Sequence, residues 1–272
     1  MKVMHFMHSM RPTRPIHVRN AAIAVAGIGA LAAFAVLPPT AGAATTPSAQ
    51  AEYQAAIKAA GTQGVHFASS ATQGGVSIEV DGDTGVTSGA QTLTVKKGSL
   101  AEHVSAKVVG STGYVQGNAT ALQNVIGLTK AQSKKYAGTW LSFPTSNSAL
   151  GELVSGLLNS QVTTELQMSG PYSYGSATTV QGQHVEAVRG SVSTQSGSKV
   201  PVVLYVPSSG SPVPIEEVTN PGKTGGSTAI HGVVVFTKWG EKTSESAPGT
   251  SVSLLKLVPA TTSGATTTTT AG

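Results

Sequence analysis

Residues 65–117 decide the fold, and they read VHFASSATQGGVSIEVDGDTGVTSGAQTLTVKKGSLAEHVSAKVVGSTGYVQG. Apolar and polar side chains alternate in short runs, for example over 65–69 and over 76–80. Turn signals separate the runs, and we expect turns at Gly74-Gly75, Asp81-Gly82-Asp83, Gly98-Ser99 and Gly113. Because successive side chains of a strand point to opposite faces, this pattern predicts a meander of antiparallel strands.

Helices are expected on both sides of this stretch. Residues 49–60 are rich in alanine and are followed by Gly61, which predicts one helix. Asn118 is expected to cap a helix over 119–126, and Thr129 one over 130–136, because their side chains can accept a free backbone N–H. Residues 149–159 are expected to form a further helix, whose broad apolar face must lie against another apolar surface.

A second set of strands is expected at 184–189, 200–206, 213–215, 231–239 and 252–258. Pro212 and Pro214 favour an edge position for residues 213–215. The order of strands, helices and strands predicts a single α+β domain over residues 49–258. Its antiparallel sheet must twist and curl, and two or three helices cover one face.

The two ends of the chain are expected to lie outside this domain. Residues 1–20 carry four positive charges, residues 21–37 are apolar, and Ala41-Gly42-Ala43 has the small residues of a cleavage site. This order predicts a secretory signal peptide over 1–43, or an uncleaved N-terminal anchor, and both place the domain outside the cytoplasm. Residues 44–48 are expected to be a spacer, and the Thr-rich residues 259–272 a disordered tail.

Composition excludes several classes of protein. The chain has no cysteine, so it holds no disulfide, cysteine-based metal site, thiol nucleophile or thioether-linked lipid. Four of the 17 basic residues lie in 1–43, which leaves 13 against 12 acidic residues in the rest. A nucleic-acid partner is therefore not expected, because phosphate binding needs clustered lysine and arginine.

Catalytic and metal-binding motifs are weak. Ser196-Gly197-Ser198-Lys199 and Lys223-Thr224-Gly225 match fragments of serine β-lactamase motifs, but turn composition explains both. Gly222-Lys223-Thr224 lacks the earlier glycine of a phosphate-binding loop, since Glu217 stands there. Asp81–Gly85 lacks the later ligands of a calcium loop and is expected to be a turn. The sequence predicts no enzyme, no cofactor and no metal site.

Several short blocks carry a resemblance. Residues 113–122 read GYVQGNATAL, residues 135–141 read KYAGTWL, and residues 235–240 read VFTKWG. Their order resembles the actinobacterial envelope lipoproteins of the LppX, LprA, LprF and LprG type. The resemblance implies a LolA/LolB-like curled antiparallel half-barrel, closed by helices on its concave face, around an apolar cavity for acyl chains. The chain departs from that family because it lacks the lipobox cysteine at the end of the leader.

Two functional hypotheses follow. The first is an exported, non-catalytic carrier or holder of a lipid or lipoglycan, expected to be a monomer that contacts a membrane through its leader or by transient docking. The alternative is a secreted or tethered sensor or scaffold ectodomain with a dry core and a protein partner. Candidate cavity residues, chosen by strand alternation and helical face with either strand parity left open, are Phe67, Ile78, Leu93, Val95, Val108, Leu153, Leu157, Val202, Leu204, Val233 and Val235.

Overall fold

The computed structural model describes residues 47–257, except for 148–150, 194–196 and 223–229. The predicted signal peptide, most of the spacer and the Thr-rich tail lie outside the described residues, as do Ser196 and Lys223–Gly225. The boundaries proposed for the domain therefore remain predictions.

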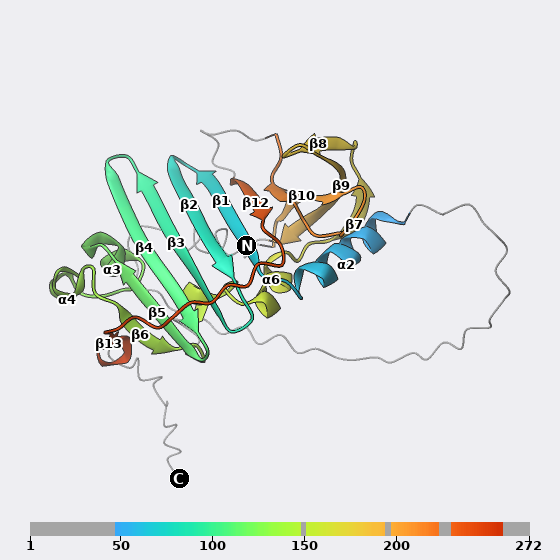
Figure 1. Cartoon of the computed structure of the whole chain (residues 1–272). Coiled ribbons are helices and arrows are strands. Elements are labelled where there is room, and N and C mark those ends of the chain that lie inside the picture. The colour runs from blue at the N-terminus through green and yellow to red at the C-terminus, as the bar shows by residue number, and fades with distance from the viewer. Residues whose placement is uncertain (1–46, 148–150, 194–196, 223–229, 258–272) are drawn as a thin grey trace, which may run out of the picture.

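The described chain forms one large sheet with a few short helices around it (Figure 1). Its strands are β1 (Val65–Gln73), β2 (Val76–Thr84), β3 (Ser88–Lys97), β4 (Leu100–Val109), β5 (Thr112–Gly117), β6 (Leu141–Pro144), β7 (Ser169–Tyr174), β8 (Thr178–Val180), β9 (Gln183–Ser193), β10 (Lys199–Pro207), β11 (Glu216–Thr219), β12 (His231–Thr237) and β13 (Val252–Ser253). The helices are α2 (Ala49–Ala60), α3 (Ala119–Asn124), α4 (Lys130–Tyr136) and α6 (Asn159–Glu165), with 3-10 turns η1 (Glu152–Val154) and η2 (Leu254–Lys256).

The strand order is β13-β6-β5-β4-β3-β2-β1-β12-β11-β10-β9-β7, and β8 pairs with β9. All of these pairs are antiparallel except β13 with β6. The chain starts at β1 in the middle of the sheet, builds one side with β2–β6, and returns to build the other with β7–β12. The predicted α+β class, with a curled antiparallel sheet, is confirmed.

One face of the sheet is buried under the helices. On β1 the buried side chains include Val65 and Phe67, and on β12 they include Val234 and Phe236. Helix α3 packs against β4 and β5, while α2 packs against α6, β7 and β9. We call this buried surface the inner face. Figure 1 shows α3 and α4 at one end of the sheet and α2 at the other.

Three predicted helices are confirmed, together with the reasons for their ends. Helix α2 spans residues 49–60 as expected, and Ser48 Oγ accepts a hydrogen bond from Ala51 N. The Asn118 side chain caps α3. Thr129 caps α4 in a capping box with Gln132, in which each side chain binds the other's backbone.

The turns expected at Asp81-Gly82-Asp83 and at Gly113 are wrong, because both segments lie inside strands. Gly82 faces Phe67 across the β1–β2 ladder, and a Cβ built on it would lie 2.8 Å from Phe67 Cζ. A Cβ on Gly113 would lie 2.5 Å from the ring of Phe143. These glycines therefore make room for aromatic rings on the inner face and do not mark chain reversals.

A single helix over residues 149–159 is also wrong. The described part of this stretch contains η1, a reversal at Gly156 with φ of +83°, and the first residue of α6. Leu158 forms a bridge with Gly85 at the end of β2. The apolar residues of this stretch therefore lie on a broken segment that follows the end of the sheet.

The second half of the sheet differs from the prediction at three places. Residues 213–215 are not a strand, and the strand that follows them, β11, lies in the interior between β10 and β12. Strands β7 and β8 were not expected. Residues 252–258 contain a two-residue strand and η2 over their described part.

Candidate functional site

The candidate site is a cavity of about 130 Å³ between the inner face of the sheet and the segment from η1 to α6. The sheet side comes from β1–β4 and β12, and Leu153, Val162 and Leu166 close the opposite side. The side chains around it are those of Val65, Phe67, Ile78, Val80, Thr84, Gln91, Leu93, Val104, Ala106, Leu153, Ser155, Val162, Glu165, Leu166 and Phe236, with the backbone of Gly156.

The wall is largely apolar because each strand contributes its inward-pointing residues. Phe67 lies opposite Phe236 in the β1–β12 ladder, and Val80 lies opposite Leu93 in the β2–β3 ladder. Leu93 and Leu153 are only half-buried, whereas Ile78 is 1% exposed. The cavity therefore reaches from the buried sheet to a rim at the η1 segment. Such a space is suited to hydrocarbon.

Four of the residues proposed from the sequence lie around this cavity, namely Phe67, Ile78, Leu93 and Leu153. Five others, Val95, Val108, Leu157, Val202 and Leu204, are buried in the core but are not part of the cavity wall. Leu157 is fully buried, and its carbonyl accepts a hydrogen bond from Gly85 N.

The last two candidates, Val233 and Val235, have the wrong strand parity. They are half-exposed, while their neighbours Val234 and Phe236 are buried on the inner face. Residues 233–236 are apolar at every position, so alternation could not identify the inner side chains in this strand.

Sequence reasoning missed other residues of the wall. Val80 and Val104 lie in the same alternating runs as the proposed residues Ile78 and Val108. The alternation of apolar and polar residues could therefore have identified them as well. Val162 and Leu166 are four residues apart and share one side of α6, a spacing that was available in the sequence.

Two glutamates belong to this region, one in the cavity wall and one on the inner face outside the wall. Glu165 of α6 is part of the wall. Glu217 of β11 is 6% exposed and lies opposite Leu204 and Val234 in the neighbouring ladders, on the inner face. Burial raises the pKa of the Glu217 carboxyl above its ordinary value, and the Glu165 carboxylate raises this pKa as well.

Tyr53 of α2 joins this helix to the chain that follows α6. Its hydroxyl donates a hydrogen bond to Leu166 O at 3.3 Å and accepts one from Met168 N at 2.9 Å. Its ring stacks on Tyr172 of β7, with 5.0 Å between the ring centroids. Burial raises the pKa of the Tyr53 hydroxyl, and Glu217 contributes to this shift. Tyr53 therefore fixes α2 to the end of α6.

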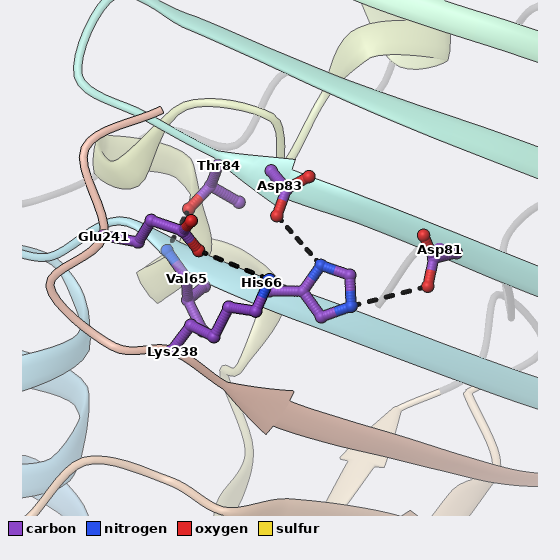
Figure 2. A network of polar contacts seen from close by, with 7 residues as sticks. All are labelled: Val65, His66, Asp81, Asp83, Thr84, Lys238 and Glu241. Carbon is purple, nitrogen blue, oxygen red and sulfur yellow. Dashed lines mark hydrogen bonds and ion pairs between the residues drawn. The ribbon is translucent and has the colours of Figure 1, made fainter. Parts of the chain in front are cut away.

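A separate polar network lies on the outer face (Figure 2). Figure 2 shows the His66 ring between two carboxylates, with Nδ1 2.9 Å from Asp83 and Nε2 3.5 Å from Asp81. Nearby, Val65 N donates a hydrogen bond to Thr84 Oγ1 at 3.1 Å. Within the described ranges, no group of three or more histidine, aspartate or glutamate residues is arranged to hold a metal ion. This network ties β1 to β2.

Comparisons with known proteins give a likeness of structure. No protein-family model matches this chain, and no curated protein matches its sequence. Its structure is similar to the crystal structure of LprF from Mycobacterium bovis, with 13% identity and a TM-score of 0.49 over 74% of this chain and 96% of that one. It is also similar to the crystal structure of the Mycobacterium tuberculosis lipoprotein LppX, with 14% identity and a TM-score of 0.44 over 72% of this chain and 97% of that one. Both proteins are of the type that the sequence blocks resemble.

Helices long and apolar enough to cross a bilayer are absent from the part of the chain that the structure describes.

Proposed function

We propose that this chain is an exported, non-catalytic protein of the cell envelope that holds or carries a lipid or lipoglycan through its hydrocarbon chain. The apolar cavity on the inner face is the observation that supports this function most strongly. Its wall is built mainly from aliphatic and aromatic side chains, which bind a ligand by removing hydrocarbon from water.

The size of the cavity limits how much of a ligand it takes up. At about 130 Å³, it is close to the engineered apolar cavity of about 150 Å³ that binds benzene. It therefore has room for a segment of about six carbons. At about 0.8 kcal/mol per buried methylene, this segment gains about 5 kcal/mol before ordering costs. The proposed site is thus sized for one hydrocarbon segment and not for several whole acyl chains.

The test is a titration of the full mature chain with 1-octanol, followed by the NMR signals of its leucine and valine methyl groups. We expect saturable shifts at the methyl groups of Val80, Leu93 and Val104, with a dissociation constant in the millimolar range or below. Leu93→Trp places an indole in the cavity and should weaken octanol binding at least about tenfold. The control is Leu100→Trp, because Leu100 is 59% exposed at the start of β4 and is not part of the cavity wall.

Equal octanol affinity in the Leu93→Trp variant would show that the cavity is not the binding site. The lack of any saturable shift at the methyl groups of the wall would indicate a closed core and favour the ectodomain alternative. Native mass spectrometry of protein purified from its own host gives an independent result, because a carrier should retain an acyl-containing molecule.

A further inference from the structure

A group of lysines lies at the end of the sheet that carries α4 and η2. Gln132 of α4 donates a hydrogen bond from Nε2 to Leu257 O at 2.8 Å, so the helix and the 3-10 turn are neighbours. Figure 1 shows α4 next to β13, which leads into η2, and α2 at the opposite end. Four exposed lysines lie on these two elements, and we call them the basic corner: Lys130, Lys134, Lys135 and Lys256.

The positive charge of the basic corner is not balanced by acids on the same segments. Residues 103–151, which include α4, contain no acidic residue, and neither do the residues after Glu245. The acids at the borders of these segments, Glu102 and Glu245, have other partners, which are Asn124 and Lys107. In the part of the chain that the structure describes, no lysine of the basic corner forms an ion pair.

The rest of the mature chain has the opposite charge. Outside residues 1–43 the chain has 13 basic and 12 acidic residues. The four lysines of the basic corner leave nine basic residues against the same 12 acids, so the remainder is net negative. A molecule charged in this way turns its positive end towards an anionic surface and its remaining surface away from it.

Helix stability does not explain the whole group. Lys134 and Lys135 lie in the last turn of α4, where positive charge is favourable to the helix dipole. Lys130 is the first residue of the same helix, where positive charge is unfavourable. Lys256 belongs to η2, a different element. A shared anionic partner accounts for all four positions.

An exposed leucine stands beside these lysines. Leu255 of η2 is 48% exposed, while the preceding residue, Leu254, is fully buried in the core and anchors the turn. A leucine among lysines is typical of surfaces that bind the interface of a bilayer, because the leucine leaves water while the lysines contact anionic head groups. A soluble polyanion would use the lysines alone. The exposed leucine therefore favours a membrane as the partner.

We propose that the basic corner docks on the surface of a membrane that contains anionic lipids, with Leu255 entering the head-group layer. This inference goes beyond the proposed function, because neither the four lysines nor Leu255 is part of the cavity wall. Docking in this way places the end of the sheet with α4 against the membrane and leaves α2 at the far end (Figure 1).

The test measures how the full mature chain sediments with vesicles of phosphatidylcholine that contain about 30% phosphatidylglycerol, at about 0.1 M salt. We expect a partition coefficient at least about tenfold higher than for vesicles of phosphatidylcholine alone. One lysine near an anionic bilayer contributes about fivefold to binding. The double variant Lys134→Gln/Lys135→Gln should therefore lose at least about tenfold in partition.

The matched control is Lys58→Gln/Lys199→Gln, which makes the same change in net charge at two exposed lysines of α2 and β10. This control should lose less than about threefold, because its lysines lie away from the docked surface. Leu255→Ser should lose at least about threefold, because less apolar area leaves water. The Leu255→Trp variant should gain a blue-shifted fluorescence emission with the anionic vesicles.

Equal partition into both kinds of vesicle, or equal losses in the two double lysine variants, would overturn the proposal. Unchanged vesicle binding in Leu255→Ser, together with equally tight binding to polyglutamate, would identify a general polyanion site and would overturn it as well. Urea unfolding shows whether each variant is folded. The octanol titration tests the cavity separately, and Lys134→Gln/Lys135→Gln should bind 1-octanol as the original protein does.

Discussion

At the scale of single residues, the cost of an acidic side chain depends on its surroundings, which differ between the inner and outer faces of the sheet. Glu217 illustrates this dependence, because it occupies a core position that an aliphatic residue would fill at no electrostatic cost. The outer-face acids Asp81 and Asp83 differ from it, because His66 lies between them. The two environments predict different responses to substitution.

The stability of the folded state should change with pH through Glu217. The folded protein raises the pKa of this carboxyl above its ordinary value of 4.5, mainly through burial. Its stabilising contribution is therefore complete below about pH 4.5 and is lost as the pH rises through the raised pKa. Glu217→Gln removes this loss, so the variant should gain on the order of 1–3 kcal/mol relative to the original protein at pH 8.

Urea unfolding at a series of pH values between 4 and 8 measures this effect. The advantage of Glu217→Gln should shrink towards zero near pH 4, where the carboxyl is protonated in both folded and unfolded chains. A constant difference across this range would mean that Glu217 does not change its protonation on unfolding.

Residue patterns predicted part of the cavity, and the reason for the failures is physical. Phe67, Ile78 and Leu93 belong to runs in which apolar and polar residues alternate, so their inward direction could be read from the sequence. Val233 and Val235 belong to a run that is apolar at each position, where alternation gives no direction. The burial of Glu217 on the inner face could not be predicted, because a glutamate normally indicates an exposed side chain.

At the scale of elements, the segment from η1 to α6 closes the cavity. Gly156 has φ of +83°, a left-handed conformation that side chains rarely adopt. A Cβ on this residue would also lie 3.3 Å from Glu165 Cγ. The glycine therefore allows both the reversal after η1 and the close approach of the acidic side chain.

Gly156→Ala should cost about 1–2 kcal/mol through backbone strain and should also shift Glu165 in the cavity wall, which weakens 1-octanol binding at least about threefold. Chemical denaturation and the ligand titration measure the two effects separately. The control is Gly127→Ala, because Gly127 has φ of +81° and a methyl group added there would meet nothing within 4 Å. An equal loss of 1-octanol affinity in both variants would mean that backbone strain, and not contact with Glu165, causes it.

Elements with local signals were predicted well, and elements that depend on distant contacts were not. Asn118 and Thr129 cap their helices through neighbouring backbone groups, so the sequence alone located α3 and α4. Residues 149–159 have the apolar spacing of a helix, but the bridge between Leu158 and Gly85 competes with it. This competitor comes from the end of β2, more than seventy residues away in the chain.

At the scale of the whole molecule, segments outside the sheet connect strands that are far apart in it. Helix α2 packs on β7 and β9, and residues 238–251 run across the strands from β12 to β13 (Figure 1). Along this path Glu245 N donates a hydrogen bond to Ser88 Oγ, and Glu245 pairs with Lys107 at 2.6 Å. These contacts hold β3 and β4 in a fixed position beneath η1. The cavity is thus bounded by parts of the chain that are far apart in sequence.

The central claim is that the inner face leaves room for hydrocarbon that its own side chains do not fill. Diffraction from crystals of the protein soaked in 1-bromohexane tests it most directly, because anomalous scattering locates the bromine without reference to the rest of the ligand. We predict one strong bromine peak between Phe67 of β1 and Val162 of α6, and its loss in crystals of Leu93→Trp. An interior without bromine, with side chains in contact across the same space, would contradict the account.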